Sequence, residues 1–567
     1  MKKTITRRHF LKKSSKMVAA AGIGGYGILL QGCSTTKDFD LIIKGGHIFD
    51  GLGNEPQQAD IGIKGGFIKA IGSLSATKAE RAIDAKNLAV CPGFIDAHDH
   101  TDIGLLVNPK AESSIRQGIT TLVSGNCGGT PFPVADEIYE EMKRNLMELY
   151  QIDLTWTDIS GFFSKLEESG IALNYSSLVG QGAIRGAVVG FNDRPPTENE
   201  LERMKFMVAE NIEGGALGLS SGLEYAPGSY AKNDEIEELS RVAGRYNGVY
   251  ATHMRDEGDR LLESLDESID IAKKTGVSLQ ISHFKIAYPR NWHKVDDALV
   301  RVEKAKEDGV DIFCDRYPYI AGSTGLSFYF PLWARQGTTE EFLARLKDPK
   351  LEGRILSHLS EQEKKLGSWD KVVISSVFSE GNKKFEGKSV MEGATETSKT
   401  PHAFMRDLLI EEKNRVGMVT FMMNEENLKK ILTHPLVGVG TDGSAIAPYG
   451  LLHKGKPHPR LYGTFPRVLG KYIREEKILS LQEMLKKITS LPAQKFGFLR
   501  RGVLKQEYYA DVVVFDRDKV IDKATWTDPH QYPVGIEYVI VNGKVVMERG
   551  EHTGNLPGRV LRKKIMV

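Results

Sequence analysis

Hydrophobic and polar positions in the middle of the chain alternate between two patterns. Short apolar runs of strand length are separated by longer segments with apolar residues at helical spacing, such as 197–215, 260–276 and 295–309. Several of these segments close on Gly, which commonly ends a helix. Eight runs of strand character can be counted, at 94–98, 120–126, 171–180, 215–222, 248–253, 277–283, 310–317 and 437–442. This alternation predicts an α/β fold built on a parallel (β/α)8 TIM-like barrel.

The two ends of the chain have a different pattern, in which short predicted strands are separated by turns. Strand patterns occur at 40–51, 59–72 and 82–93, and again at 510–518 and 536–550. Neither piece buries enough surface alone, so we expect one small β-sandwich or β-barrel domain built from both termini. The predicted limits are 34–93 and 491–567 for this domain and 94–490 for the barrel. A long stretch near 324–430 is expected to be a helical, charged insertion that could cover the site.

The first 33 residues are typical of an export signal. Arg7 and Arg8 resemble a twin-arginine motif, and an apolar, Gly-rich run follows them. The run ends at Cys33 in Leu-Gln-Gly-Cys, which resembles a lipobox, so lipidation of Cys33 is expected. An uncleaved membrane anchor is the alternative. Either way, we expect the body of the protein on the periplasmic side, attached to a membrane.

Charge and cysteine content narrow the class further. The formal charge is +2, and removing the first 33 residues, with seven Lys and Arg and no acid, brings it to −5. The basic clusters are terminal, so no nucleic-acid partner is predicted. Beyond Cys33, three cysteines remain, Cys91, Cys127 and Cys314, and they imply no disulfide framework. Nothing in the sequence indicates the oligomeric state.

Six side chains with metal-binding or proton-transfer chemistry stand at the ends of predicted strands. Each has an ordinary interpretation when taken alone: a structural histidine, a buried thiol or a helix cap. Taken together at one barrel mouth, their N, S and carboxylate donors suit Zn²⁺ and a hydrolytic site. The six are His98, His100, Cys127, His253, His283 and Asp442.

Several segments carry a specific family resemblance, which extends over about residues 38 to 560. They are "PGFIDAHDH", "GNCGGTPFPV", "GLEYAPG", "YPYIAGST", "HPRLYGTFPRVLG" and the closing "RRGVLKQEYYADVVVFD". These segments resemble the amidohydrolase superfamily, and within it the N-acyl-D-amino-acid deacylases, or D-aminoacylases. The fourth predicted strand lacks the lysine that bridges metals in many amidohydrolases, whereas Cys127 follows the second strand. That difference disfavours hydantoinase-like or dihydroorotase-like activity.

The resemblance implies a set of roles for individual residues. Cys127, His253 and His283 would hold one tight Zn²⁺. His98, His100 and Asp442 would frame a second, weaker metal position, with Asp442 as the catalytic base and acid. The implied substrate contacts are Lys285, Arg460, Tyr317, Ser323 and Tyr225.

The implied activity is zinc-dependent hydrolysis of a small-molecule N-acyl-D-amino acid to a carboxylate and a free D-amino acid. One alternative is a peptidase or deacylase acting on D-residue dipeptides or cell-wall fragments. A cyclic amidase and a non-catalytic, ligand-binding lipoprotein are further alternatives.

Overall fold

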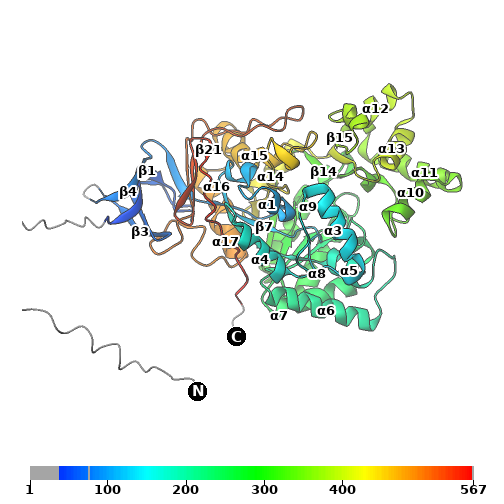
Figure 1. The fold of residues 1–567 in the computed structure, drawn as a ribbon, viewed down its shortest axis with the longest axis horizontal. Helices are drawn as coiled ribbons and strands as arrows, with labels where there is room; N and C mark the ends of the chain where they lie inside the picture. Colours follow the sequence, from blue (N-terminus) through cyan, green and yellow to red (C-terminus); the bar gives the residue numbers. More distant parts are fainter. Residues whose placement is uncertain (1–36, 75–76, 565–567) are drawn as a thin grey trace, which may run out of the picture.

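The computed structural model describes residues 37–74 and 77–564 and has a mixed α/β architecture. A β-rich region lies at one end, strands and helices form the middle, and an insertion projects on the far side (Figure 1). The predicted export signal, with Arg7, Arg8 and Cys33, lies outside the described residues. Within the described ranges, no helix combines the length and the apolar character needed to cross a bilayer.

The strands of the middle region pair in parallel in two groups. One group runs in the order β6-β7-β8 and the other in the order β17-β13-β12-β11-β10-β9. Each of the eight predicted apolar runs overlaps at least one of these strands. Their bounds are β6 Phe94–Asp96, β7 Ile119–Ser124, β8 Asn174–Ser177, β9 Val179–Gly180, β10 Gly218–Gly222, β11 Val249–His253, β12 Ser278–Ile281, β13 Ile312–Arg316 and β17 Val437–Val439.

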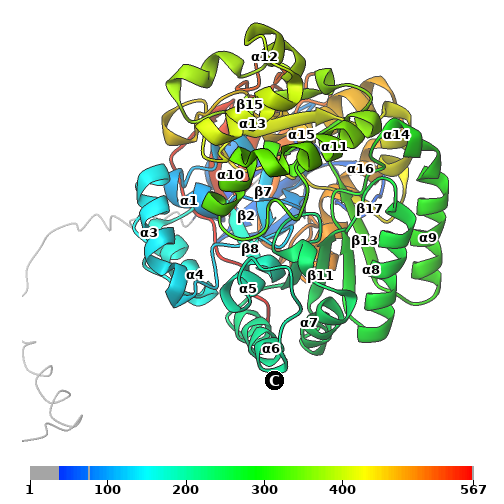
Figure 2. The ribbon, with the colours of Figure 1, turned by 90° about the vertical axis from the view of Figure 1, so that its right-hand side faces the viewer.

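Amphipathic helices pack around these strands, and their ends follow local sequence signals. α6 (Glu198–Glu213) begins with a capping box between Thr197 and Glu200, which satisfies two backbone N–H groups. α8 (Leu261–Thr275) ends at Gly276, whose φ of 70° is left-handed. Figure 2 shows α5 to α9 as a wall outside the parallel strands. The other helices of the middle region are α1 Asp102–Val107, α2 Glu112–Ile115, α3 Asp136–Tyr150, α4 Ile159–Ser169, α5 Gln181–Val188, α7 Asn233–Arg245, α9 Val295–Glu307, α14 Glu425–Thr433, α15 Arg460–Arg467, α16 Leu481–Ile488 and α17 Ser490–Lys495.

Strands from the two ends of the chain belong to one nine-stranded sheet. Its order is β21-β20-β19-β18-β5-β1-β2-β3, with β4 paired to β1. The chain ends meet where β18 pairs antiparallel with β5. The bounds are β1 Phe39–Ile48, β2 Gln57–Lys64, β3 Phe67–Gly72, β4 Ala79–Asp84, β5 Ala89–Pro92, β18 Val512–Phe515, β19 Ile536–Val541, β20 Lys544–Glu548 and β21 Glu551–His552. The tail then returns to β8, where Leu561 N–H donates to Tyr175 O at 2.7 Å.

The insertion is not wholly helical, so that expectation was wrong. It contains α10 (Thr339–Lys347), α11 (Pro349–Leu366), α12 (Val390–Glu396) and α13 (Pro401–Glu411). It also contains an antiparallel sheet, β14-β16-β15, formed by Ala321–Gly325, Gly417–Phe421 and Val372–Ser376. These strands are five residues long and far apart in sequence, so their pairing depends on tertiary contacts. They pack with the helices around a separate core that includes Trp369, Ile374 and Met418.

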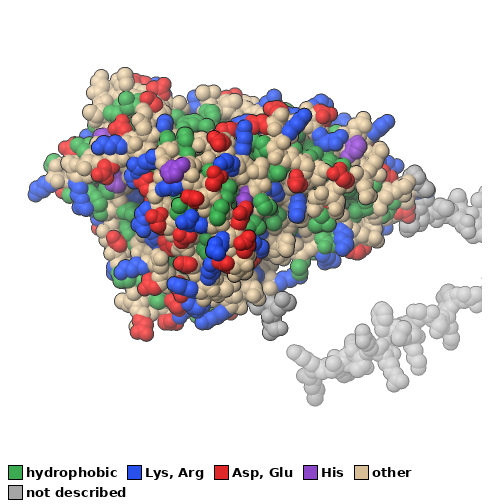
Figure 3. All heavy atoms as spheres, turned by 180° about the vertical axis from the view of Figure 1, so that it is seen from behind, with side chains coloured by type: hydrophobic (Ala, Val, Ile, Leu, Met, Phe, Trp, Pro, Cys, Tyr) green, Lys and Arg blue, Asp and Glu red, His purple; other side chains and the backbone are tan. Residues whose placement is uncertain are grey.

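Charged side chains of both signs are interspersed over the face opposite to that of Figure 1 (Figure 3). Ion pairs link many charged side chains of the described residues, for example Arg301 with Asp266 and Arg562 with Glu167. Such exposed pairs contribute little to stability, about 0–1 kcal/mol each. This mixed surface is consistent with a small net charge.

Candidate metal centre and its cavity

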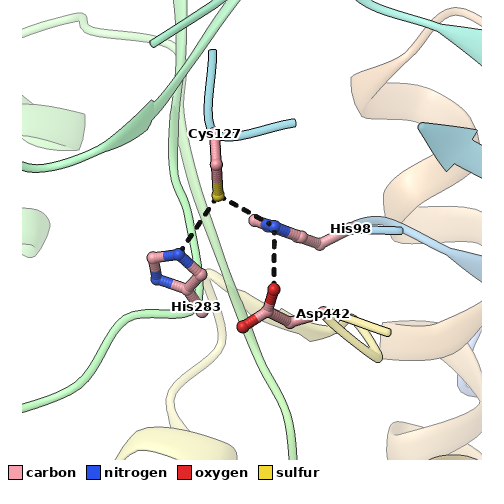
Figure 4. A group of neighbouring side chains, drawn as sticks. All are labelled: His98, Cys127, His283 and Asp442. Carbon is pink, nitrogen blue, oxygen red and sulfur yellow. Dashed lines mark hydrogen bonds and ion pairs between the residues drawn. The ribbon is translucent and has the colours of Figure 1, made fainter. Parts of the chain in front are cut away.

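Four of the predicted site residues meet at one point at the carboxyl ends of four strands. Figure 4 shows His98, Cys127, His283 and Asp442 directed toward one another from the segments that follow β6, β7, β12 and β17. Cys127 Sγ lies 3.4 Å from the Nε2 atoms of both His98 and His283. His98 Nε2 lies 3.5 Å from Asp442 Oδ1. One donor atom from each of the four lies within 4.8 Å of the others.

The backbone at this point is held in an unusual conformation. Cys127, His283 and Asp442 have φ values of 53°, 38° and 47°, in the left-handed region that non-glycine residues rarely adopt. Close packing leaves the Cys127 loop little freedom: a Cβ at Gly222 would lie 2.1 Å from Cys127 O. Strained residues of this kind occur preferentially at functional sites. The fold therefore places these three side chains at a backbone cost.

His253 and His100 complete the set of predicted ligands at the edges of this cluster. His253, the last residue of β11, groups with Glu257 and His283, and its ring centroid is 4.5 Å from that of His283. Its Nδ1 is buried and has no hydrogen-bond partner in the part of the chain that the structure describes. His100 Nε2 lies 3.1 Å from Asp442 Oδ1. All six predicted residues are thus brought into one region.

The first strand is shorter than predicted. The sequence indicates a strand over 94–98, with His98 as its last residue, but β6 ends at Asp96. His98 and His100 both lie on the irregular segment beyond it, where His100 N–H donates to Gly443 O at 2.7 Å. The strand ends early because the Asp96 carboxylate accepts from Thr441 N–H and from His98 N–H, in place of ladder partners.

Two buried carboxylates that the sequence did not single out hold the histidine rings. Asp315 Oδ1 lies 3.2 Å from His98 Nδ1, and Glu257 Oε1 lies 3.0 Å from His283 Nδ1. An Nδ1–H that donates to a carboxylate leaves Nε2 free as a metal ligand and fixes the ring orientation. In both rings, Nε2 is the atom that faces Cys127. The two carboxylates therefore prepare both imidazoles to bind a metal.

Replacing Asp315 by Asn should lower the zinc affinity of the weaker position, which His98 is predicted to frame, about 10–100-fold, because a neutral amide oxygen accepts from His98 Nδ1–H more weakly than the carboxylate does. The measurement is competition for Zn²⁺ against a chromophoric chelator. Asp311→Asn is the matched control, since its carboxylate pairs with Ser278 and Lys495 just before β13 begins. Equal affinity in the two variants would contradict the role of Asp315.

The cluster opens into a cavity of about 320 Å³ that contains all five predicted substrate contacts. Tyr317 and Arg460 lie close together, with the guanidinium carbon 4.7 Å from the ring centroid. The Tyr317 hydroxyl and Arg460 Nε are buried, and neither has a hydrogen-bond partner among the described residues. Tyr319, two residues further along, packs against His458 and Trp526 instead. Tyr317 is therefore the tyrosine of this segment that faces the cavity.

The other three predicted contacts line the cavity with their polar atoms already engaged, or through an aromatic ring. Lys285 is 3% exposed, and its Nζ lies 2.5 Å from Glu257 and 2.8 Å from His283 Nδ1. Ser323 Oγ donates to Met418 O at 2.9 Å. The ring of Tyr225 packs against His253, with the centroids 4.8 Å apart. Glu224, next to Tyr225, also lines the cavity and was not predicted.

Electrostatics favour the ionised forms of the thiol and the carboxylate at the centre. Burial alone would raise the pKa of the Cys127 thiol, but His98 and His283 hold that pKa well below its usual value. Burial would also raise the pKa of Asp442, but Arg460, whose Nη1 lies 2.8 Å from Oδ2, keeps it well below the usual range. A thiolate is the metal-binding form of cysteine, and a carboxylate can accept a proton.

The donor set fits a zinc ion. Thiolate sulfur and imidazole nitrogen are the ligands that Zn²⁺ prefers, and a nearby carboxylate is common in hydrolytic zinc sites. The buried, unpartnered Nδ1 of His253 and the fixed orientation of two further rings are consistent with residues arranged around a metal.

Comparisons with known proteins agree with this chemistry. A family model described as "Amidohydrolase family" matches residues 399–547. The chain is 34% identical to an N-acyl-D-glutamate deacylase of Alcaligenes xylosoxydans xylosoxydans over 529 residues, which is 93% of this chain and 97% of that protein.

Solved structures give the same result. The chain is similar to N-acyl-D-glutamate deacylase from Bordetella bronchiseptica, solved with zinc and a phosphonate that mimics the tetrahedral intermediate. That match has a TM-score of 0.79 and 34% identity and covers 92% of this chain and 99% of the other. A D-aminoacylase with a binuclear metal centre, described by one-metal activation and second-metal attenuation, matches with a TM-score of 0.77, 34% identity and coverage of 92% and 100%.

Proposed function

Because the chain belongs to the amidohydrolases, in the family of N-acyl-D-amino-acid deacylases, we propose that it hydrolyses the amide bond of N-acyl-D-amino acids. The products are a carboxylate and a free D-amino acid. The observation that carries this proposal is the position of Asp442. Its ionised carboxylate lies between the thiolate–imidazole cluster and Arg460, in a cavity large enough for a small substrate.

We propose that Cys127, His253 and His283 hold one tight Zn²⁺, and that His98, His100 and Asp442 frame a second, weaker position. The 3.4 Å contacts of Cys127 with His98 and His283 support a metal position near the thiolate. Zinc bound there supplies Lewis-acid chemistry, polarising a carbonyl oxygen and lowering the pKa of a water molecule toward neutrality.

Asp442 moves the proton in this proposal. Its carboxylate takes a proton from the attacking water and then gives that proton to the nitrogen of the departing amine. The ion pair with Arg460 keeps Asp442 ionised and aimed at the cluster before the reaction starts. The same side chain thus serves as base and then as acid.

Tyr317 and Arg460 orient the substrate. The Tyr317 hydroxyl, which has no hydrogen-bond partner among the described residues, can donate to the oxygen that becomes negatively charged as the tetrahedral centre forms. Arg460 Nε offers a donor to the α-carboxylate, and the ammonium of Lys285, which also lines the cavity, adds positive charge near it. The carboxylate is held at one point and the carbonyl at another. Only one configuration of the α-carbon then places the amide next to Asp442.

Enantiomer-resolved hydrolysis tests this function. The zinc-loaded protein should release free amine from N-acetyl-D-amino acids and not from the matching L forms, across Leu, Met, Phe, Glu and Asp. The preferred side chain would be read from the same panel. Equal hydrolysis of D and L forms would contradict the two-point fixation. No turnover of any member would contradict the proposal and favour D-residue dipeptides as substrates.

We further propose that the two groups of parallel strands close into one (β/α)8 barrel. Two contacts between the groups support closure: Leu217 N–H donates to Ser177 O at 2.8 Å, and Asp442 N–H donates to His98 O at 2.8 Å. In such a barrel the metal cluster occupies the carboxyl-terminal mouth, where barrel enzymes carry their sites.

Export and lipid attachment through Cys33 are also proposed, on the strength of the Arg7-Arg8 pair and the lipobox-like ending. The test is membrane fractionation of the full chain and its Cys33→Ala variant. Equal membrane retention of both would contradict lipidation at this residue.

A further inference from the structure

A second, larger hollow adjoins the reaction cavity. It is a groove of about 660 Å³ that shares His100, Ser323 and Thr324 with the cavity. Its walls come from α1, α3, the insertion strands and the loop that follows β17, where α1 and α3 face the insertion (Figure 2). An acetyl group would use little of this space. The groove is therefore larger than the smallest substrate requires.

The groove begins on the metal side of the cavity. Its wall includes His100 itself, Gly129, two residues after Cys127, and Ser444, two residues after Asp442. Neither of the proposed carboxylate-binding residues, Lys285 and Arg460, lines it. A substrate whose α-carboxylate lies at Lys285 and Arg460, and whose carbonyl lies at the metal cluster, would point its acyl group toward the groove.

The walls are suited to a hydrocarbon chain. Seven large apolar side chains line the groove: Ile103, Met142, Tyr150, Ile446, Leu451, Leu452 and Leu461. The two charged residues that line it have partners, since Asp102 accepts from the Tyr175 hydroxyl at 2.5 Å and Lys454 lies over the Tyr150 ring at 4.9 Å. The apolar side chains stabilise methylene groups by removing them from water. Hydroxyl groups also line the groove, from Thr130, Ser323, Thr324, Ser375, Ser376 and Ser444.

We propose that this groove binds the acyl chain of the substrate, and that the enzyme prefers unbranched medium-chain N-acyl-D-amino acids to N-acetyl ones. The inference rests on the proposed deacylase function. It adds a site for the acyl half that is separate from the carboxylate-binding end.

A chain-length series tests the proposal. The substrates are the N-acetyl, N-butanoyl, N-hexanoyl and N-octanoyl derivatives of the D-amino acid that is hydrolysed best. From acetyl to hexanoyl, kcat/KM should rise about threefold per added methylene, the gain expected for burying most of each CH₂ group. If kcat/KM stayed constant or fell as the acyl chain lengthened, the groove would not be the acyl-chain site, while the deacylase function would stand. No hydrolysis of any member would instead count against the function itself.

Variants locate the effect in the groove. Met142→Asp, on α3, should lower the hexanoyl-to-acetyl ratio of kcat/KM at least tenfold, since a carboxylate there opposes the hydrocarbon chain. Leu452→Asp, on a different wall, should do the same and provides a second test if the first variant does not fold. Met147→Asp is the matched control on α3, because Met147 is 48% exposed and does not line the groove. A ratio unchanged in both groove variants, or lowered equally in the control, would overturn the proposal.

Discussion

Replacing Asp442 by Asn is expected to lower kcat by about 10²–10⁴-fold, the contribution of a positioned general acid and base. Asn matches the size of Asp but cannot take the proton of the attacking water. The zinc content should stay at the wild-type level, because Cys127, His253 and His283 are unchanged. Turnover of the best N-acyl-D-amino acid and metal content measured on the same sample check this result.

Two outcomes separate proton transfer from structural damage. A variant that keeps its zinc and its thermal stability but loses turnover supports the role of Asp442. A kcat within about tenfold of wild type would exclude Asp442 as the main proton carrier. Loss of zinc would instead mean that Asp442 acts chiefly as a ligand, through the oxygen that lies 3.5 Å from His98 Nε2 and 3.1 Å from His100 Nε2.

Replacing Cys127 by Ala should abolish tight zinc binding and, with it, activity. The thiolate lies between His98 and His283, so its removal takes away the sulfur ligand around which the imidazoles converge. The loss of affinity should exceed the about 10–100-fold cost of removing a group that only orients a ligand. Zinc content after dialysis, measured by atomic absorption, checks the prediction.

The chain offers a matched control for this substitution. Cys314→Ala removes a buried thiol from β13, the strand that also carries Asp315. Cys314 itself belongs to neither candidate metal group. The substitution should cost some stability through the small cavity that it leaves, with no change in zinc content. If Cys127→Ala retained one zinc per chain as firmly as Cys314→Ala does, the thiolate could not be a ligand.

Much of the strand order could be predicted because each parallel strand is buried on both faces. Runs such as 248–253 and 277–283 carry apolar residues over the length of a strand and end in a histidine, so the sequence indicates strand and ligand together. The insertion sheet lacks this signal. Each of its strands contains partly exposed residues and pairs with segments far away in sequence, as Gly417–Phe421 does with both Ala321–Gly325 and Val372–Ser376.

The supporting carboxylates could not be predicted for a related reason. In "THMRDE", Asp256 and Glu257 are neighbours with similar chemistry, and only the fold decides that Glu257 reaches Lys285 and His283. Asp315 lies near the end of a mostly apolar run, and the sequence does not distinguish a carboxylate that supports a ligand from an ordinary polar residue at a strand end. Its role depends on the approach of His98, 217 positions earlier.

Reconstitution of the metal-free protein tests the central claim most directly. Zinc is removed with a chelator and returned in measured steps, while release of D-amino acid from the best N-acyl-D substrate is followed. We predict no activity without metal, a linear rise that ends at one zinc per chain, and no activity on the L substrate at any step. Full activity of the metal-free protein, or a rise that ends only at two zinc ions per chain, would contradict a single tight catalytic metal at Cys127, His253 and His283.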